Sequence, residues 1–175
     1  MRDAMRWLSA YPETIAWDTP LAVQPIDQLF SRAVSRFAER PAINFFDQRL
    51  SYRELDQLIS RAAHGLQQLG VKPGVHVGLY LPNCPHYFIS FYAVLRAGGT
   101  VVNYSPLDAE RTLAHKIEDS RTDIMLTLDL QAFYPKMASL LASSRLQTLV
   151  VGELTEFCAA PVSTAQADQL GPRAE

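Results

Sequence analysis

The sequence predicts an α/β fold in which helices cover both faces of a mainly parallel sheet. Strand-like and helix-like patterns alternate from residue 75 to residue 151. The run Val75–Leu81 is almost continuously apolar, as in strands that are buried on both faces. A helical segment then ends at Gly98-Gly99 and leads directly into another apolar strand. Alternation of this kind is typical of parallel strands that are joined by helices.

The first regular elements that the sequence predicts are a helix and a hairpin. Apolar residues recur every three or four positions from Ile26 to Phe37, which predicts a helix with one buried face that ends before Pro41. Residues 42–46 have the composition of a strand, and Asp47-Gln48-Arg49 is the expected turn. We therefore expect a β-hairpin over Ala42–Leu50.

A capping box marks the start of the next helix. The Ser51 hydroxyl can accept a hydrogen bond from the Glu54 amide, while the Glu54 side chain can accept one from the Ser51 amide. The apolar stripe of this helix runs to Leu69, and Gly70 follows as a residue suited to positive φ. The turn at Pro73-Gly74 then leads into the apolar strand.

Residues 85–97 are apolar almost all round, which predicts a helix at the centre of the core. Asn83 is the expected N-cap of this helix. We expect Gly98 to end the helix with positive φ, and the β-branched residues after it favour a strand at 100–103. The stretch Leu95–Pro106 is therefore predicted to be structural.

The remaining pattern alternates in the same way. Asp108 is expected to cap a helix that runs to about Asp119, followed by a strand at 123–128, a helix at 131–144 and a strand at 146–151. From Gly152 the composition shifts to Ala, Ser, Thr, Gln and Pro. We therefore divide the chain into three parts. Residues 1–25 form an irregular N-terminal arm whose aromatic residues pin it to a larger body. Residues 26–151 form an α/β unit, and residues 152–175 form a linker or tail.

Composition narrows the classes of protein to consider. The chain has 175 residues, of which 48% are hydrophobic, and this is enough to bury the core of one domain. Its formal net charge is -2 and it has no basic cluster, so we expect no nucleic-acid partner. Its two cysteines, Cys84 and Cys158, lie too far apart in sequence for a zinc-binding pair. Together with the lack of an evident signal peptide, this favours the cytoplasm.

No catalytic motif is complete in the sequence. It contains neither a glycine-rich phosphate loop nor a nucleophile elbow. The pair Gly98-Gly99 follows a helix instead of preceding one, which is the wrong polarity for an anion site at a helix N-terminus. His115 lies near Glu118 and Asp119, but a solvated charge cluster explains this group better than a metal site, which needs three or four ligands. We therefore assign no catalytic, cofactor-binding or metal-binding residue.

His86 is the one candidate for contact with a ligand. It lies in the first turn of the predicted central helix, beyond the end of a strand, where ligands collect in open α/β sheets. A histidine at the start of a helix is more often an ordinary polar residue, so both interpretations stay open. Cys84 lies near the same helix end, which can lower a thiol pKa, but a small buried cysteine is the simpler interpretation.

Three segments resemble, in this order, the N-terminal part of the adenylate-forming enzymes, which comprise acyl-CoA synthetases, luciferases and the adenylation domains of peptide synthetases. Leu50–Leu55 resembles the first core motif of that family, and Leu95–Pro106 resembles the second. Between them, Gly74–Leu81 and the turn Pro82-Asn83-Cys84 are similar to the segment that precedes the second motif. The positions that carry these motifs are Ser51, Tyr52, Glu54, Leu55, Asn83, Ala97, Gly98, Gly99, Asn103 and Pro106.

The resemblance implies an N-terminal piece of an ATP-dependent acyl-CoA ligase. Such an enzyme joins a carboxylate to ATP, giving an acyl adenylate and pyrophosphate, and CoA then displaces AMP, so ATP, Mg²⁺ and CoA are the implied cofactors. Val102–Leu107 looks more like fatty acyl-CoA ligases than peptide-synthetase domains, which tend to place proline where Asn103 stands. The family's phosphate loop and C-terminal catalytic lysine have no counterpart in this sequence. The resemblance therefore implies scaffold roles for the motif residues and an inactive isolated chain.

Two other functions stay open from the sequence. A non-catalytic binding or interaction module could use the same scaffold, and an adenylation domain could deliver its product to a carrier protein. Within a ligase, the chain would pack against the remainder of the ligase chain, and the substrate would be a small-molecule carboxylic acid, with a fatty acid favoured. An isolated piece of a larger domain exposes apolar surface, so we expect self-association.

Overall fold

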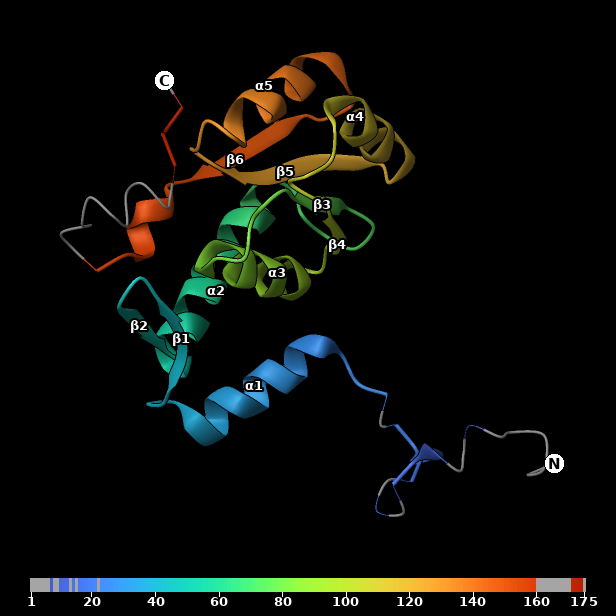
Figure 1. The fold of residues 1–175 in the computed structure, drawn as a ribbon, viewed down its shortest axis with the longest axis vertical. Helices are drawn as coiled ribbons and strands as arrows, with labels where there is room; N and C mark the ends of the chain where they lie inside the picture. The colour runs from blue at the N-terminus through green and yellow to red at the C-terminus, as the bar shows by residue number, and fades with distance from the viewer. Residues whose placement is uncertain are drawn as a thin grey trace.

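The computed structural model describes residues 7, 10–12, 14, 16–21, 23–159 and 171–174. Helices and strands alternate through most of this range (Figure 1). The elements are α1 (Ile26–Phe37), β1 (Pro41–Phe45), β2 (Gln48–Ser51), α2 (Tyr52–Gln68), β3 (His76–Leu79), α3 (Pro85–Ala97), β4 (Thr100–Asn103), α4 (Glu110–Asp119), β5 (Thr122–Leu128), α5 (Tyr134–Ser143), β6 (Thr148–Gly152) and the 3₁₀ helix η3 (Leu154–Phe157).

Four strands form one parallel sheet in the order β4-β3-β5-β6. Helices α2 and α3 lie on one face of this sheet, and α4 and α5 lie on the other (Figure 1). The predicted fold, a mainly parallel sheet with helices on both faces, is therefore confirmed.

Each face of the sheet has its own hydrophobic core, because side chains alternate along the central strands. Ile124 and Leu126 of β5 pack toward α2 and α3, whereas Met125 between them packs toward α4 and α5. All three are buried. Burial on both faces explains why these three consecutive residues are all apolar.

The β-hairpin expected over Ala42–Leu50 is confirmed as the antiparallel pair β1 and β2. Its turn differs from the prediction, because Phe46 and Asp47 form it with φ values of 42° and 64°. Gln48 and Arg49, which were expected in the turn, instead pair with β1 as part of β2. Two-residue turns with positive φ match the twist of antiparallel strands, which favours this tighter register.

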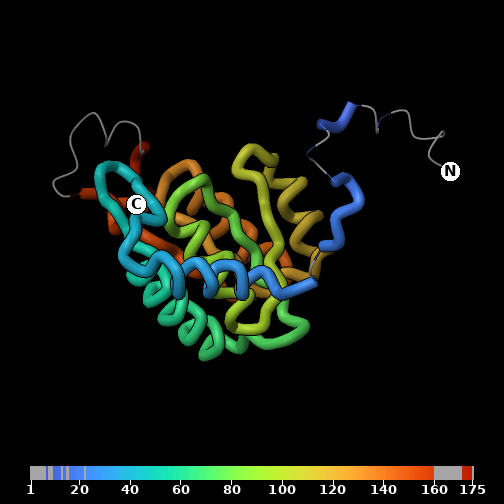
Figure 2. Tube along the Cα trace, turned by 90° about the horizontal axis from the view of Figure 1, so that it is seen from below, coloured from blue at the N-terminus to red at the C-terminus, as the bar shows by residue number. Residues whose placement is uncertain are grey.

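Helix α1 lies across α2 and α3 (Figure 2). The Phe30 ring anchors it, with ring centroids 5.6 Å from Phe88 and 4.9 Å from Tyr92. Ile26 and Leu29 are each 51% exposed, so the predicted apolar face of this helix is only partly buried.

The predicted starts of α4 and α5 are wrong by a few residues. The N-cap of α4 is Ala109, and Asp108 instead pairs with Lys116 at 2.6 Å. That ion pair engages the carboxylate that would otherwise cap the helix. Helix α5 begins at Tyr134 and not at residue 131, with a proline in its first turn.

The ends of the chain contribute smaller contacts. In the N-terminal arm, the Trp7 ring lies 5.7 Å from that of Tyr11 and 5.4 Å from that of Trp17, measured between centroids. Residues 171–174 return to the sheet edge, where the Ala174 amide donates to the Asp129 carbonyl at 2.7 Å. The division into arm, α/β unit and tail stays a prediction, as does the docking of the arm onto a larger body.

Among the described residues, no helix has the length and apolar character needed to span a bilayer.

Candidate functional site

The carboxyl ends of the four parallel strands meet at one edge of the sheet, which is where open α/β sheets bind ligands. The segment after β3 carries Asn83 and His86, and the segment after β4 carries Pro106. Asp129 follows β5, and Glu156 lies in η3 after β6. The fold thus brings together side chains that are far apart in the sequence.

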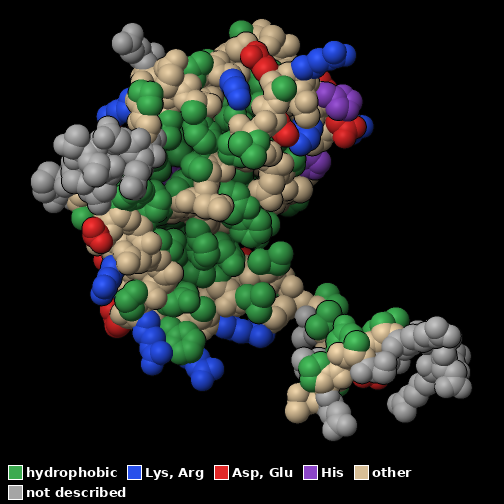
Figure 3. Space-filling view, viewed as in Figure 1, with side chains coloured by type: hydrophobic (Ala, Val, Ile, Leu, Met, Phe, Trp, Pro, Cys, Tyr) green, Lys and Arg blue, Asp and Glu red, His purple; other side chains and the backbone are tan. Residues whose placement is uncertain are grey.

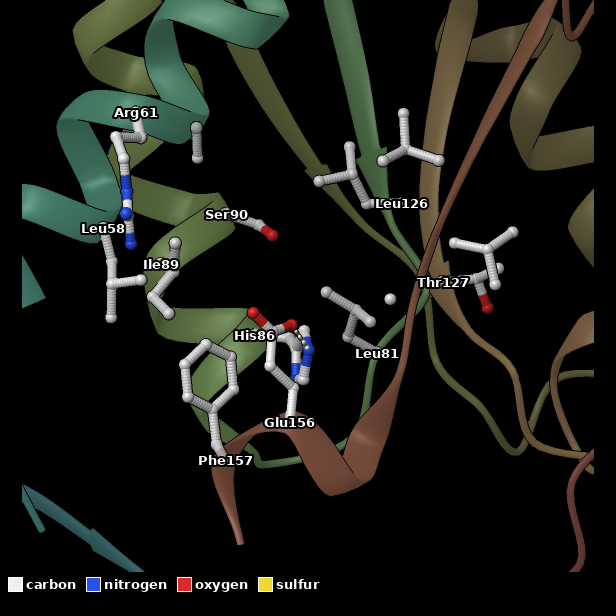
Figure 4. A pocket seen from close by; sticks show the side chains of 14 residues that line it. Leu58, Arg61, Leu81, His86, Ile89, Ser90, Leu126, Thr127, Glu156 and Phe157 are labelled. Atoms are coloured by element: carbon white, nitrogen blue, oxygen red, sulfur yellow. Dashed lines mark ion pairs between the residues drawn. The ribbon is translucent and has the colours of Figure 1, made fainter. Parts of the chain in front are cut away.

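A cleft of about 450 Å³ opens beside this edge, between α2, α3 and the ends of β5 and β6 (Figure 4). Arg61 reaches it from α2, His86 from α3, and Glu156 and Phe157 from η3. Its apolar walls come from Leu58, Ala62, Leu81, Ile89, Leu126 and Val150.

His86 lies at the polar end of this cleft, with 12% of its side chain exposed. Its ring packs edge-on against Phe157, with centroids 4.7 Å apart. A Cβ atom at Gly152 would come within 2.7 Å of the His86 ring, so only glycine lets the end of β6 approach this closely. The His86 side chain is therefore held by contacts from two elements that follow it in the chain.

Among the described residues, neither ring nitrogen of His86 has a hydrogen-bond partner. Nε2 lies 3.6 Å from a Glu156 carboxylate oxygen, which is beyond hydrogen-bond distance. Burial lowers the pKa of His86 below its ordinary value, and the charges of Glu156 and Asp129 oppose this shift only in part. At neutral pH the ring is therefore mainly uncharged, with one nitrogen that donates and one that accepts.

Helix η3 is fixed to the sheet edge by Asp129. The Leu154 amide donates to Oδ1 of Asp129 at 3.2 Å, and Arg173 pairs with Oδ2 at 2.7 Å. Arg173 also pairs with Glu153 at 3.0 Å. These contacts hold Glu156 and Phe157 against the start of α3.

Asn83 does not cap α3, contrary to the prediction. The N-cap residue is Cys84, and Pro85 occupies the first helical position. Proline is well suited to this position, because an N–H group there would have no partner within the helix. Burial raises the pKa of the Cys84 thiol, so this cysteine is not activated by the helix end.

Asn103 and Pro106 bond to aromatic residues of the scaffold. The Tyr87 hydroxyl donates to Oδ1 of Asn103 at 3.1 Å, and the Tyr80 hydroxyl donates to the Pro106 carbonyl at 3.3 Å. The first bond ties the end of β4 to α3, and the second ties the segment after β4 to Tyr80, which follows β3.

The glycine pair lies at the opposite, amino-terminal edge of the sheet, between Ala97 at the end of α3 and the start of β4. Gly98 has a φ of +90°, as predicted for the residue that ends the helix. A Cβ atom at Gly99 would lie 2.7 Å from Cγ1 of Val71, so this position needs glycine for close packing. The pair is therefore remote from His86.

The first motif is a helix start. The Glu54 amide donates to the Ser51 hydroxyl at 3.2 Å, and the Ser51 amide donates to the Glu54 carboxylate at 2.8 Å, so the predicted capping box is present. Tyr52 packs near Phe30, and Leu55 is fully buried. These contacts are structural, although scaffold roles in a complete enzyme stay a prediction.

The sequence pointed to His86 but missed its neighbours. Arg61 looked like one of many surface charges on a helix, and Gly152, Glu156 and Phe157 lie in a segment with the composition of a linker. Within the described residues, no group of three or more His, Cys, Asp and Glu side chains is arranged to hold a metal ion.

Comparisons with known proteins place the sequence in a family. The profile of the family described as AMP-binding enzyme matches residues 30–172. A long-chain-fatty-acid–CoA ligase of Bacillus subtilis is 30% identical over 161 residues, which are 92% of this chain and 28% of that protein. The corresponding ligase of Salmonella typhimurium is 36% identical over 116 residues, covering 65% of this chain and 21% of the ligase. A linear gramicidin synthase polypeptide of Brevibacillus parabrevis is 37% identical over 100 residues, covering 57% of this chain and 1% of the synthase.

Solved structures share the fold. An anthranilate CoA ligase, AuaEII, superposes with a TM-score of 0.68 at 22% identity, over 77% of this chain and 26% of that one. A fatty acyl CoA synthetase of Mycobacterium tuberculosis gives 0.67 at 19% identity, over 73% and 26%. This chain thus spans between about a fifth and somewhat over a quarter of the ligases and synthetases that it matches, 21% to 28% of their length. Because the family profile matches most of its length, the chain belongs to the AMP-binding enzyme family of adenylate-forming enzymes.

Proposed function

We propose that this chain is the N-terminal part of an ATP-dependent acyl-CoA ligase that acts on a carboxylic acid, with a fatty acid as the favoured substrate. The observation that carries the proposal is the match to a long-chain-fatty-acid–CoA ligase over 92% of this chain. The complete enzyme would form an acyl adenylate from the acid and ATP, and would then transfer the acyl group to CoA. Cysteine usage supports a cytoplasmic enzyme.

The contribution of this chain is to build one part of the α/β scaffold of the ligase. The capping box, the glycine pair and Asn103 each fix a helix or a strand end. The sequence has no glycine-rich phosphate loop. The described residues also lack a carboxylate cluster of the kind that would bind Mg²⁺. The residues present do not fit ATP with Mg²⁺, so we assign the ATP and Mg²⁺ sites to the remainder of the ligase, and the CoA site with them.

The test of inactivity uses the isolated 175-residue chain. We expect no ATP–pyrophosphate exchange with hexadecanoate, because the sequence has no phosphate loop to hold the triphosphate. The intact B. subtilis ligase serves as the positive control in the same assay. Exchange by a pure sample of the chain would contradict the proposal.

The test of the ligase assignment is a graft. The matching segment of the B. subtilis ligase is replaced by this chain, and a second graft carries the Salmonella segment as a control for the junctions. We expect both grafts to form hexadecanoyl-CoA. Failure of this chain in a folded graft, while the Salmonella graft is active, would argue that the chain is a non-catalytic module.

A second candidate is an adenylation domain that delivers its product to a carrier protein. The similarity to two linear gramicidin synthase polypeptides favours this alternative. The two candidates differ in the thiol that accepts the acyl group. Formation of an acyl-carrier thioester, without acyl-CoA, by the protein that contains this chain would support the carrier alternative.

A further inference from the structure

The cleft beside His86 has the size and lining of a small-molecule site. Its volume of about 450 Å³ lies in the range of ligand pockets, and most of its lining is apolar with a few polar groups. Leu58 and Ile89 form one wall, and Leu81 and Leu126 face them (Figure 4). A cavity of about 150 Å³ is enough to hold benzene, so this cleft has room for an apolar body of one or two aromatic rings.

His86 brings two unsatisfied polar atoms to the cleft. Both of its ring nitrogens lack a partner within the described part of the chain, although little of the side chain is exposed. A buried polar group without a partner is costly, so a molecule that bonds to it gains binding energy. A neutral imidazole offers one donor and one acceptor. A primary amide or a hydroxyl group on the ligand can pair with either nitrogen.

The charges around His86 select a neutral head group. The carboxylate of Glu156 lies 3.6 Å from Nε2, and Asp129 lies nearby in its ion pair with Arg173. An anionic head on His86 would meet the Glu156 charge, and a cationic head would have to leave water at a side chain that is only 12% exposed, which is costly.

We propose that this cleft binds a neutral amphipathic small molecule, with an apolar body against Ile89 and Leu126 and a single amide or hydroxyl head on His86. The proposal rests on the lining of the cleft and does not depend on the ligase activity.

Benzamide is the probe, because it joins an aromatic ring to an amide. We expect saturable chemical-shift changes in the amide resonances of the 175-residue chain, confined to residues that line the cleft. Toluene lacks the head and benzoate carries a charge, so each should bind about three-fold more weakly or worse. Absence of saturable changes, changes elsewhere on the protein, or equal binding of toluene would overturn the proposal.

Three variants test whether the chemical-shift changes come from binding in the cleft. His86→Phe keeps an aromatic ring against Phe157 but removes both nitrogens, so benzamide should lose its advantage over toluene. His86→Gln keeps a donor and an acceptor and should retain that advantage. Ile89→Trp places an indole ring where the apolar body is proposed to lie and should weaken binding of both compounds about tenfold or more. Thermal unfolding checks that each variant is folded. Unchanged benzamide binding by folded Ile89→Trp would refute the site even if His86→Phe did not fold.

Discussion

Gly98 ends α3 because its φ of +90° lies in the left-handed region, where an L side chain is strained. Space is also short there, since an added Cβ atom would lie 3.2 Å from Cδ of Pro73. The two effects act together at this one position, and neither involves the cleft. The residue is therefore fixed by backbone geometry and local packing.

Substitution of Gly98 is expected to cost stability. Gly98→Ala should lower the free energy of unfolding by about 1–2 kcal/mol, the cost of left-handed backbone for an L-residue. Gly65→Ala is the matched control, because Gly65 lies inside α2 with open space around its Cα. It should raise stability by about 0.5–1 kcal/mol. Urea unfolding measures both, and equal effects of the two variants would show that the assignment of Gly98 is wrong.

For individual residues, the sequence predicted the place of a residue in a helix or strand better than it predicted which residues contact it. The place of His86 at a helix start beyond a strand follows from local pattern alone. Its contacts with Gly152 and Phe157 depend on how the chain folds back after β6. Local periodicity carries no information about where the chain after β6 packs, so the cleft could not be predicted.

Among the helices, an N-cap could be predicted where two residues of the sequence cap each other's backbone amides. At α2, Ser51 and Glu54 each satisfy a backbone amide of the other, so two residues three apart specify the helix start together. Asn83 and Asp108 were predicted from residue type alone, and both predictions were wrong. Pro85 and the ion pair of Asp108 with Lys116 decided those helix starts instead.

Loss of the α2 cap is expected to be measurable. Ser51→Ala should lower the free energy of unfolding by about 1 kcal/mol, because the Glu54 amide loses the hydroxyl that accepts its hydrogen bond. Ser35→Ala is the control, since Ser35 is an exposed serine inside α1 whose hydroxyl donates to the Ser31 carbonyl. We expect this control to stay within about 0.5 kcal/mol of the wild type. A loss no larger for Ser51→Ala than for Ser35→Ala in urea unfolding would refute the role of the cap.

The same cap has a pH dependence. Hydrogen bonds from Ser51 lower the pKa of Glu54 below its ordinary value of 4.5. A lowered carboxyl pKa stabilises the folded state above the unfolded-state pKa, and this contribution is lost as pH falls through the folded-state pKa. The stability difference between wild type and Ser51→Ala should therefore shrink below about pH 4.5.

On the scale of the whole molecule, the sequence predicted the sheet and the helices on its two faces. It did not predict which apolar residues are buried in the core and which stay exposed. The parallel sheet and its two helical faces follow from the alternation of apolar patterns. Which apolar residues stay exposed depends on what else packs on them. Hydrophobic side chains gather over the middle of the molecule in the view of Figure 3. Leu21 and Val23 before α1 are almost fully exposed, as is Leu107.

This exposed apolar surface leads us to expect self-association of the isolated chain. Ile26 and Leu29 are each about half exposed on α1, and the exposed residues Leu21 and Val23 precede them in the chain. Burying such side chains between two copies gains about 25 cal/mol for each Å² removed from water. Sedimentation velocity should therefore show a weight-average mass that rises with protein concentration.

The double variant Ile26→Asp/Leu29→Asp places two charges on that surface and should weaken self-association about tenfold or more, since buried unpaired charges are costly. Ser31→Asp/Ser35→Asp is the matched control, because it adds the same charge to the same helix at exposed polar positions. This control should associate as the wild type does. If the wild-type chain stays monomeric at every concentration and binds little hydrophobic dye, then the exposed residues of α1 do not form an interface and the chain needs no further partner to cover them.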